Sequence, residues 1–491
     1  MLFFTVSYFA YFLPIVFGCF LICKTIFSSQ SAIILLIVAS WIFYAYWELK
    51  FLPLLLFSLI FNRLVAESFT NARFVHDDRI VRKIFIFGVA INLALLGYFK
   101  YKNFFLGSLG YTEEFNLSKI TIPLGISFFT FQQIAYLSDA RKQKSELCGR
   151  FEYVLFISFF PQLIAGPVLY FKEFIPQIRN AISLPLEPKV VFSAIVLFSF
   201  GLFKKVVVAD NFGILSDSFF ASPETTDMLA AWVAMLSFTL QIYYDFSGYC
   251  DMAIGSALLF NIRLPRNFHY PFLSANLSEF WRRWNITVSR WFRDYLFRPL
   301  GGTRKSIPAS LRNLLVTFIF SGLWHGAGLT FIFWGFLHGV GVSIHHTWTR
   351  LGMRMSKPFG VMLTFSFFLI TAVYFRSASL SDGHRIILGA IGLANGNGCW
   401  ELLGNNLSKA LGGYGKSTWI VGVWNSNVII VASLIVWSIL DHVIRLNSHE
   451  RLVVKNKSIR ICDCLFVSSA FVLIVVFSNN VVDTPFIYFD F

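Results

Sequence analysis

The chain has 491 residues, of which 56% are hydrophobic and only 14% are charged, and its formal net charge is +15. Soluble proteins have roughly 25% charged residues, so this composition excludes a soluble protein and indicates an integral membrane protein in a lipid bilayer. The positive charge lies in short loops between apolar runs, as the positive-inside rule requires, and this argues against a nucleic-acid-binding protein.

Apolar runs of spanning length follow one another along the whole chain, with no β pattern and no internal repeat. We therefore expect an all-α polytopic transmembrane bundle of about 11 to 13 membrane segments, some of them re-entrant, forming a single domain over residues 1–491. The first run lacks a basic leader and a cleavage site, so it is expected to be a retained helix. The runs lie at 3–23, 31–46, 50–61, 84–99, 120–137, 151–169, 190–208, 228–247, 310–325, 328–346, 359–376, 417–440 and 462–478.

Basic loops set the expected orientation. The loop at 445–460 is rich in Lys and Arg and is expected on the cytoplasmic side, whereas 377–415 and the C-terminal tail carry few basic residues and are expected outside. The seven cysteines show no framework spacing, and no HExxH or CxxC cluster is present. We predict no structural disulfide, no metal site and no tightly bound cofactor.

Residues 312–346 are expected to form a helical hairpin with a histidine at its apex. Counted back from the loop at 445–460, the segment that begins at Arg312 enters the membrane from the inside. His325 follows 13 residues later, which is about 20 Å of helix and therefore deep in a roughly 30 Å hydrocarbon core. The glycines of Gly326-Ala327-Gly328 permit a tight turn directly after it.

Asn285 and His325 are costly residues in hydrocarbon, and two interpretations are open. They could be buried polar residues that only tie helices together. Alternatively, they form a proton-transfer centre in which neutral His325 takes a proton from an attacking hydroxyl. Asn285 cannot titrate, so it would orient the histidine or donate a hydrogen bond to the developing oxyanion. His338, on the returning helix, is expected to be a structural partner rather than a second base.

A basic, aromatic segment at about 276–312 precedes the hairpin. Between Arg282 and Arg312 it has eight basic residues against one acid, with aromatic residues interleaved, and it is expected to be an amphipathic helix in the cytoplasmic interface. It could anchor lipid headgroups, recognise an anionic acyl donor through Arg forks, or do both. The candidate donor-binding or interfacial residues are Arg282, Arg283, Trp284 and Arg293.

Other polar residues within apolar runs are expected to line a tunnel or to have structural roles. Asp245 and Asp251 are expected to cap helix ends or bond to backbone at a break near Gly248. Of Gln132 and Gln133, only one is expected to face a polar tunnel, because adjacent helical positions point about 100° apart.

Five ordered motifs resemble the membrane-bound O-acyltransferase superfamily. They are PLGISFFTFQQIAYLSD, FFPQLIAGPVLYF, YYDFSGYCDMAIGSALLFNIRLPRNFHYPF, FWRRWNITVSRWFRDYLFRPLGG and SGLWHGAGLTFIFWGFLHG. The resemblance covers essentially residues 1–491, including the closing PFIYFDF, and is strongest to the bacterial branch that acylates alginate, peptidoglycan and teichoic acids. It implies a bundle enclosing a central tunnel.

The resemblance also implies roles for single residues. His325 matches the invariant catalytic histidine, and Asn285 falls at the second active-site position. The bacterial relatives usually have WRRWH where this chain has WRRWN, whereas Asn is common in the eukaryotic acyl-coenzyme-A branch. Tyr488, in the closing motif, is either an interfacial aromatic anchor or a relay that carries the acyl group to a partner.

The function implied is transfer of an acyl group, expected to be acetyl from cytosolic acetyl-CoA, across the cell inner membrane. The acceptor is expected to be an exported polysaccharide, alginate first, with a periplasmic SGNH-type protein completing the transfer. Peptidoglycan or another glycan, and D-alanyl transfer of the teichoic-acid type, are alternative readings. A transporter or flippase for a lipid-linked sugar is a more remote one, and the absence of a detectable repeat argues against it.

Overall fold

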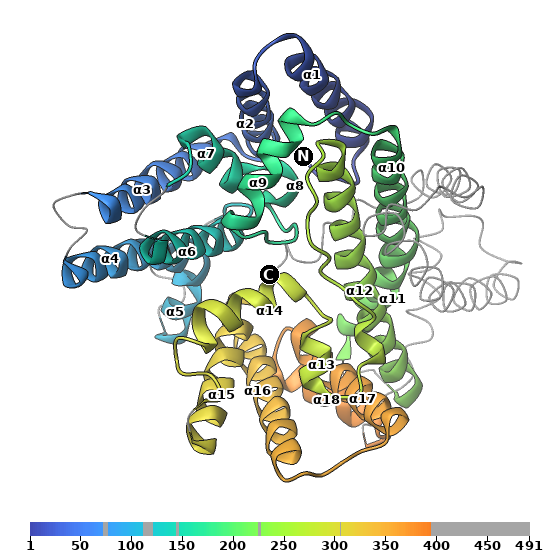
Figure 1. Ribbon diagram of the computed structural model, residues 1–491. Coiled ribbons are helices and arrows are strands. Elements are labelled where there is room, and N and C mark those ends of the chain that lie inside the picture. Colours follow the sequence, from blue (N-terminus) through green and yellow to red (C-terminus); the bar gives the residue numbers. More distant parts are fainter. Residues whose placement is uncertain (72–76, 111–120, 144–146, 224–226, 305, 394–491) are drawn as a thin grey trace, which may run out of the picture.

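The computed structural model describes residues 1–71, 77–110, 121–143, 147–223, 227–304 and 306–393 (Figure 1). Throughout these ranges every regular element is a helix. Six helical stretches are long and apolar enough to cross a membrane. The protein is therefore a helical polytopic membrane protein, as predicted. The runs at 417–440 and 462–478, the loop at 445–460 and Tyr488 lie outside the described residues.

The first half of the chain contains most of the helices that flank the centre of the molecule (Figure 1). They are η1 (Ser7–Phe12), α1 (Leu13–Ile26), α2 (Ser29–Ala45), η2 (Leu49–Phe51), α3 (Leu52–Thr70), α4 (Asp78–Leu96), η3 (Gly97–Tyr101), α5 (Lys102–Ser108), α6 (Ile126–Gln143), α7 (Arg150–Ser158), α8 (Phe160–Leu163), α9 (Phe171–Ser183), α10 (Pro188–Phe203), η4 (Lys204–Ala209) and α11 (Asp210–Phe220). The elements η1, η3 and η4 are π-helical turns.

The second half contains the predicted hairpin and the helices that pack on it. They are α12 (Met228–Leu259), η6 (Pro271–Leu273), α13 (Leu277–Trp281), α14 (Ile286–Phe292), η7 (Arg293–Phe297), α15 (Ile307–His325), α16 (Leu329–Arg350), α17 (Lys357–Arg376) and α18 (Leu380–Ala390). Figure 1 shows α15 and α16 side by side, and both α16 and α12 contact α17.

Helix α12 corrects one prediction, because it does not break near Gly248. It runs unbroken for 32 residues, about 48 Å at roughly 1.5 Å per residue. A Cβ on Gly248 would lie 2.7 Å from the carbonyl oxygen of Gly201, so this glycine allows α10 and α12 to approach closely. The small residue serves helix packing rather than a turn.

Asp245 and Asp251 neither cap helix ends nor bond to a broken backbone; both lie inside α12 and form buried ion pairs. Lys204 Nζ pairs with a carboxylate oxygen of Asp251, and Lys205 Nζ lies 3.1 Å from Asp245 and 2.7 Å from Asp210. All five residues are at most 5% exposed. Charges buried in this way need paired partners, and here the partners come from three consecutive elements, η4, α11 and α12.

Candidate active site

The predicted helical hairpin forms at residues 307–350. Helix α15 ends at His325, the backbone of Gly326 is extended, and α16 begins at Leu329. The two helices cross at a pair of glycines: a Cβ on Gly322 would lie 2.2 Å from the Phe331 carbonyl oxygen, and one on Gly335 would lie 2.3 Å from that of Phe318. Hydrogen is therefore the only side chain that this crossing accepts without a shift.

Two residues that the sequence analysis did not single out hold the end of α15. Lys100 Nζ donates to the carbonyl oxygens of Trp324, at 2.6 Å, and His325, at 2.9 Å. The Tyr101 hydroxyl donates to the carbonyl oxygen of Leu323 at 2.6 Å. Both belong to the π-helical turn η3 and both are buried. The sequence does show a lysine directly after the apolar run 84–99, which is unusual in a membrane segment. No neighbouring residue indicates that its partners are the carbonyls of α15.

The His325 side chain is 5% exposed and lies among aromatic rings. Ring centroids lie 4.9 Å away for Trp324 and 5.2 Å away for both Trp334 and Phe375, all with steep interplanar angles. Rigid rings of this kind restrict where the imidazole can lie. A histidine at depth, fixed by its surroundings, is consistent with the proton-transfer interpretation.

His338 and His325 both contact the Trp334 ring. The His338 Nε2 is 3.1 Å from the Thr371 hydroxyl, and its ring centroid is 4.6 Å from that of Trp334, which lies 5.2 Å from the His325 ring. The bond to Thr371 gives His338 a contact with α17. Its Nδ1 is buried with no hydrogen-bond partner among the described residues.

Asn285 lies at a left-handed turn that the sequence analysis did not predict. Its φ is 42°, a conformation that asparagine tolerates better than most residues, and its side chain is 2% exposed. Asn267 holds the turn: its carbonyl oxygen accepts from the Ile286 N–H, and its side-chain Oδ1 accepts from the Thr287 N–H and hydroxyl. Asn285 Oδ1 has no hydrogen-bond partner among the described residues.

The prediction of one amphipathic helix over 276–312 is therefore wrong. The segment consists of α13, the Asn285 turn, α14 and η7, followed by non-helical turns before α15. Three of its aromatic side chains do not anchor lipid, since Trp284, Trp291 and Phe292 are at most 6% exposed and pack in the protein core. The helix breaks because pairing with residues 267–269 replaces helical hydrogen bonds at 283–287.

The candidate donor-binding arginines lie on this segment, and two of them are already paired. Arg283 forms an ion pair with Glu279, and Arg293 Nε lies 3.0 Å from Asp294. Arg282 is exposed and donates to the Ser278 hydroxyl at 3.1 Å. Burial would raise the pKa of the Asp294 carboxyl, but the hydrogen bond and charge of Arg293 outweigh it, so the pKa lies below its ordinary value. Of these three arginines, Arg282 is therefore the one whose guanidinium has no carboxylate partner among the described residues.

A chain of ring contacts connects the Asn285 turn to His325. Trp281, four residues before Asn285, has its ring centroid 5.7 Å from that of Trp334, and the Trp334 ring lies 5.2 Å from the His325 ring. Trp281 also contacts His338 at 5.1 Å. The two segments predicted to carry the chemistry therefore pack against the same ring, Trp334.

Gln132 and Gln133 are both buried, but they differ in their hydrogen bonds. Gln133 accepts a hydrogen bond from the Tyr153 hydroxyl at 2.8 Å and donates to Ser58, so its role is structural. Both side-chain polar atoms of Gln132 are buried without a partner among the described residues. The ring of its neighbour Phe131 stacks on Trp324 at 5.0 Å. Gln132 is therefore the glutamine available to a polar ligand or water.

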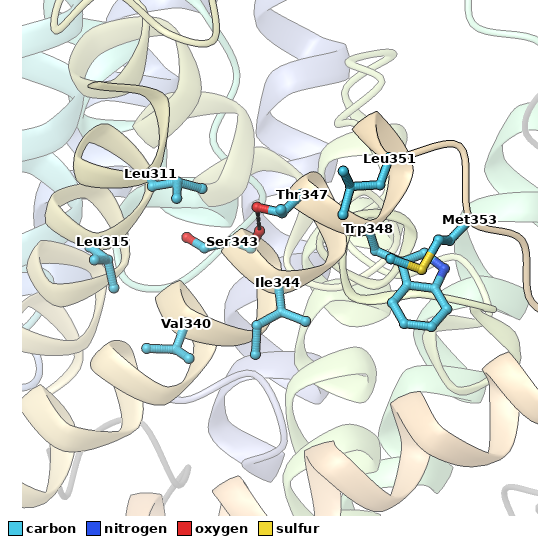
Figure 2. Close-up of a pocket in the computed structure, with 9 residues that line it drawn as sticks. All are labelled: Leu311, Leu315, Val340, Ser343, Ile344, Thr347, Trp348, Leu351 and Met353. Atoms are coloured by element: carbon cyan, nitrogen blue, oxygen red, sulfur yellow. Dashed lines mark hydrogen bonds between the residues drawn. The ribbon is translucent and has the colours of Figure 1, made fainter. Parts of the chain in front are cut away.

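A separate cavity of about 360 Å³ lies on the hairpin away from His325 (Figure 2). Its walls come from both helices of the hairpin and the loop after α16. The lining residues are Leu311, Leu315, Val340, Ser343, Ile344, Thr347, Trp348, Leu351 and Met353. Neither Asn285 nor His325 lines it. Its apolar walls, with Ile344 and Leu351 more than 60% exposed, are typical of a surface that faces lipid.

The chain matches a known protein family and several known relatives. The model of the membrane-bound O-acyltransferase family matches residues 74–378, a range that contains both Asn285 and His325. The peptidoglycan O-acetyltransferase of Helicobacter pylori is 38% identical over 389 residues, covering 73% of each chain. The probable alginate O-acetylase AlgI of Pseudomonas aeruginosa is 35% identical over 392 residues, covering 77% of this chain and 72% of the relative.

A more distant relative has a different printed activity. The teichoic acid D-alanyltransferase of Bacillus subtilis is 28% identical over 215 residues, covering 41% of this chain and 53% of the relative. All of these relatives carry names of acyl-transferring enzymes. With the family model matched over more than half of its length, the chain belongs to the membrane-bound O-acyltransferase family and is an O-acyltransferase.

Proposed function

We propose that this enzyme transfers an acetyl group from cytosolic acetyl-CoA towards an exported polysaccharide, with alginate as the first candidate acceptor. The observation that carries the proposal is the placement of His325 at a buried helix end, enclosed by aromatic rings and fixed from η3. The names of the alginate and peptidoglycan relatives support acetyl as the acyl group and a glycan as the acceptor class.

In this mechanism His325 is the general base. It takes the proton from an acceptor hydroxyl as that oxygen attacks the acetyl carbonyl carbon. A new C–O ester bond forms, the C–S bond of the thioester breaks, and the proton passes to the departing thiolate to give free coenzyme A. The Asn285 amide N–H donates to the oxygen that becomes negative during the attack. The surrounding rings keep bulk water away from the imidazole and so limit hydrolysis of the thioester.

Several buried polar atoms lack a partner among the described residues, and they support a route for substrate. Besides Asn285 Oδ1 and both ends of Gln132, they include Nε1 of Trp281, Nε1 of Trp324 and Nδ1 of His338. Buried polar groups are nearly always hydrogen-bonded, so these atoms can take water or substrate as partners. A tunnel through the bundle, open to both aqueous sides, would supply them.

The orientation and the partner complete the proposal. The donor enters from the cytoplasmic side of the cell inner membrane, the C-terminus lies outside, and a periplasmic SGNH-type protein receives the acetyl group. Arg282, which is exposed and lies three residues before Asn285, is a candidate contact for the phosphates of the donor. Tyr488 would carry the acetyl group to the partner. If Tyr488→Phe leaves acetylation of the polymer intact, the relay is excluded.

Labelled acetyl transfer tests the proposal directly. Membranes with wild-type protein, His325→Ala and the lipid-facing control Ile344→Ala are supplied with labelled acetyl-CoA, and the ester label on extracellular glycan is measured. We expect the label to be lost with His325→Ala and retained with the control. Unchanged turnover with His325→Ala would end the assignment of this residue as the base.

Peptidoglycan is the second candidate acceptor, favoured by the 38% identity to the Helicobacter pylori enzyme. Mass analysis of the extracellular glycans of a deletion strain distinguishes the candidates. Lost acetyl esters on uronate polymers support alginate, whereas lost esters on muramic acid residues support peptidoglycan. Lost D-alanyl esters would instead indicate the activity named for the Bacillus subtilis relative.

A further inference from the structure

Each of the last four carbonyls of helix α15 accepts a hydrogen bond, and three of these bonds come from η3. The last four carbonyls of an α-helix lack partners within the helix. Here the Gly322 carbonyl accepts from the Gly326 N–H at 3.4 Å, the Leu323 carbonyl from Tyr101, and those of Trp324 and His325 from Lys100. Two consecutive residues of η3 therefore satisfy three consecutive carbonyls, the last of which belongs to His325 itself.

Burying the Lys100 side chain to bond two carbonyls has a large desolvation cost. Its side chain is 8% exposed, and no carboxylate in the described ranges forms an ion pair with it. By contrast, Lys204 and Lys205, which are also buried, both have aspartate partners. The compensation for Lys100 comes from two charge-assisted hydrogen bonds and from the negative end of the α15 helix dipole. A neutral donor could satisfy a carbonyl at a lower cost of burial.

The cost is explained if the cation fixes the helix end on which the histidine lies. We propose that Lys100 and Tyr101 are positioning residues for His325, and that the Lys100 ammonium is the principal contact that sets the imidazole where acyl transfer requires it. This inference rests on the proposed role of His325 as the base. The residues act through the backbone of α15 and do not touch the reacting atoms.

The geometry of η3 suits this task. The π-helical turn at Gly97–Tyr101 lies between α4 and α5. Such turns are rare in proteins, and those that do occur are often found at functional sites. The next residue, Lys102, is half-buried and lies over the Tyr98 ring at 5.2 Å. Lys100 and Lys102 thus form a matched pair of lysines in one short segment. Among the contacts of the described residues, Lys100 bonds to α15 and Lys102 does not.

A substitution series separates positioning from folding. Lys100→Met, Lys100→Gln and Lys100→Arg are compared with Tyr101→Phe and with the matched controls Lys102→Met and Tyr98→Phe. Acetyl transfer is measured per amount of folded protein, and kcat and the KM for acetyl-CoA are determined separately. A 1 Å misplacement can lower turnover by about 100-fold, so we expect a fall in kcat of that order for Lys100→Met, with KM little changed.

The conservative variants sharpen the expectation. Lys100→Arg retains the charge and several donors and should recover part of the kcat, whereas the neutral donor of Lys100→Gln should recover less. Tyr101→Phe removes one neutral hydrogen bond and should lower kcat by about fivefold. The controls should behave as wild type. In a His325→Ala background, Lys100→Met should cause no further loss of residual turnover, because both changes remove the same step.

Each outcome decides one of the two ideas. If Lys100→Met lowers only the amount of folded protein and leaves kcat intact, or if its effect adds fully to that of His325→Ala, the positioning role is overturned. If His325→Ala itself retains turnover, the proposed function of His325 fails, whatever the Lys100 series shows. Loss of kcat with Lys100→Met, partial rescue by arginine and wild-type controls together support the inference.

Discussion

The glycine crossing of α15 and α16 gives a prediction whose size follows from the structure. In Gly335→Ala, the new Cβ would lie 2.3 Å from the Phe318 carbonyl oxygen, whereas real Cβ atoms stay beyond 3.0 Å. The helices must therefore separate by at least about 0.7 Å, since 3.0 − 2.3 = 0.7. Overpacking of this kind costs about 1–3 kcal/mol of stability. Because His325 ends α15, the same shift should lower turnover by about 10- to 100-fold.

The assay compares labelled-acetyl incorporation per folded protein with the thermal unfolding midpoint in detergent. Gly18→Ala is the matched control, because no atom lies within 4 Å of its new Cβ and alanine is the better helix former by about 1 kcal/mol. Gly322→Ala, with its Cβ 2.2 Å from the Phe331 carbonyl oxygen, should repeat the effect from the other helix. Wild-type turnover and an unchanged midpoint in Gly335→Ala would refute the tight crossing.

Three further changes test the surroundings of the site. Asn285→Gly should fold normally, because glycine accepts a φ of 42°, yet lose acetyl transfer with the amide; retained transfer would exclude the oxyanion role. Lys204→Met should lower the free energy of unfolding by about 3–5 kcal/mol, because it leaves the Asp251 charge buried without its partner. The double variant Lys204→Met with Asp251→Leu should recover most of this loss. Equal unfolding midpoints for the single and double variants would contradict this prediction. Asn267→Ala should cost about 1–3 kcal/mol, seen as a lower midpoint, and no change would mean that the Asn285 turn needs no such support.

Features that depend on neighbouring residues could be predicted from the sequence. The hairpin was predictable because an apolar run, a histidine and two glycines follow one another within a few residues, and α15 does end at His325. The break after α7 also has a local cause, since Pro161 lies at the start of the short helix α8 and Pro167 follows it, and both prevent a continuous helix there. Local sequence decides such boundaries directly.

Features that depend on residues far away in the chain could not be predicted from the sequence. The turn at Asn285 forms because Asn267 bonds to it, and no pattern within 276–312 reveals that partner. Lys100 bonds to carbonyls more than 220 residues away in the chain. Asp245 and Asp251 look like interruptions of an apolar run until Lys204 and Lys205 are placed beside them. In each case tertiary pairing overrides what periodicity indicates.

The buried polar groups of this protein fall into two kinds, and the difference bears on where chemistry takes place. Some are satisfied within the protein, such as Asn62 with Asn92 and Gln133 with Tyr153, and they tie helices together. Others, Nε1 of Trp324 and Nδ1 of His338 among them, lack partners among the described residues. The Trp324 ring contacts His325, and the Trp334 ring contacts both histidines. If the hairpin served packing alone, nothing would favour such polar atoms around a histidine whose backbone is held by Lys100. Polar atoms left for a substrate near a positioned base are what a reaction that moves a hydroxyl proton requires.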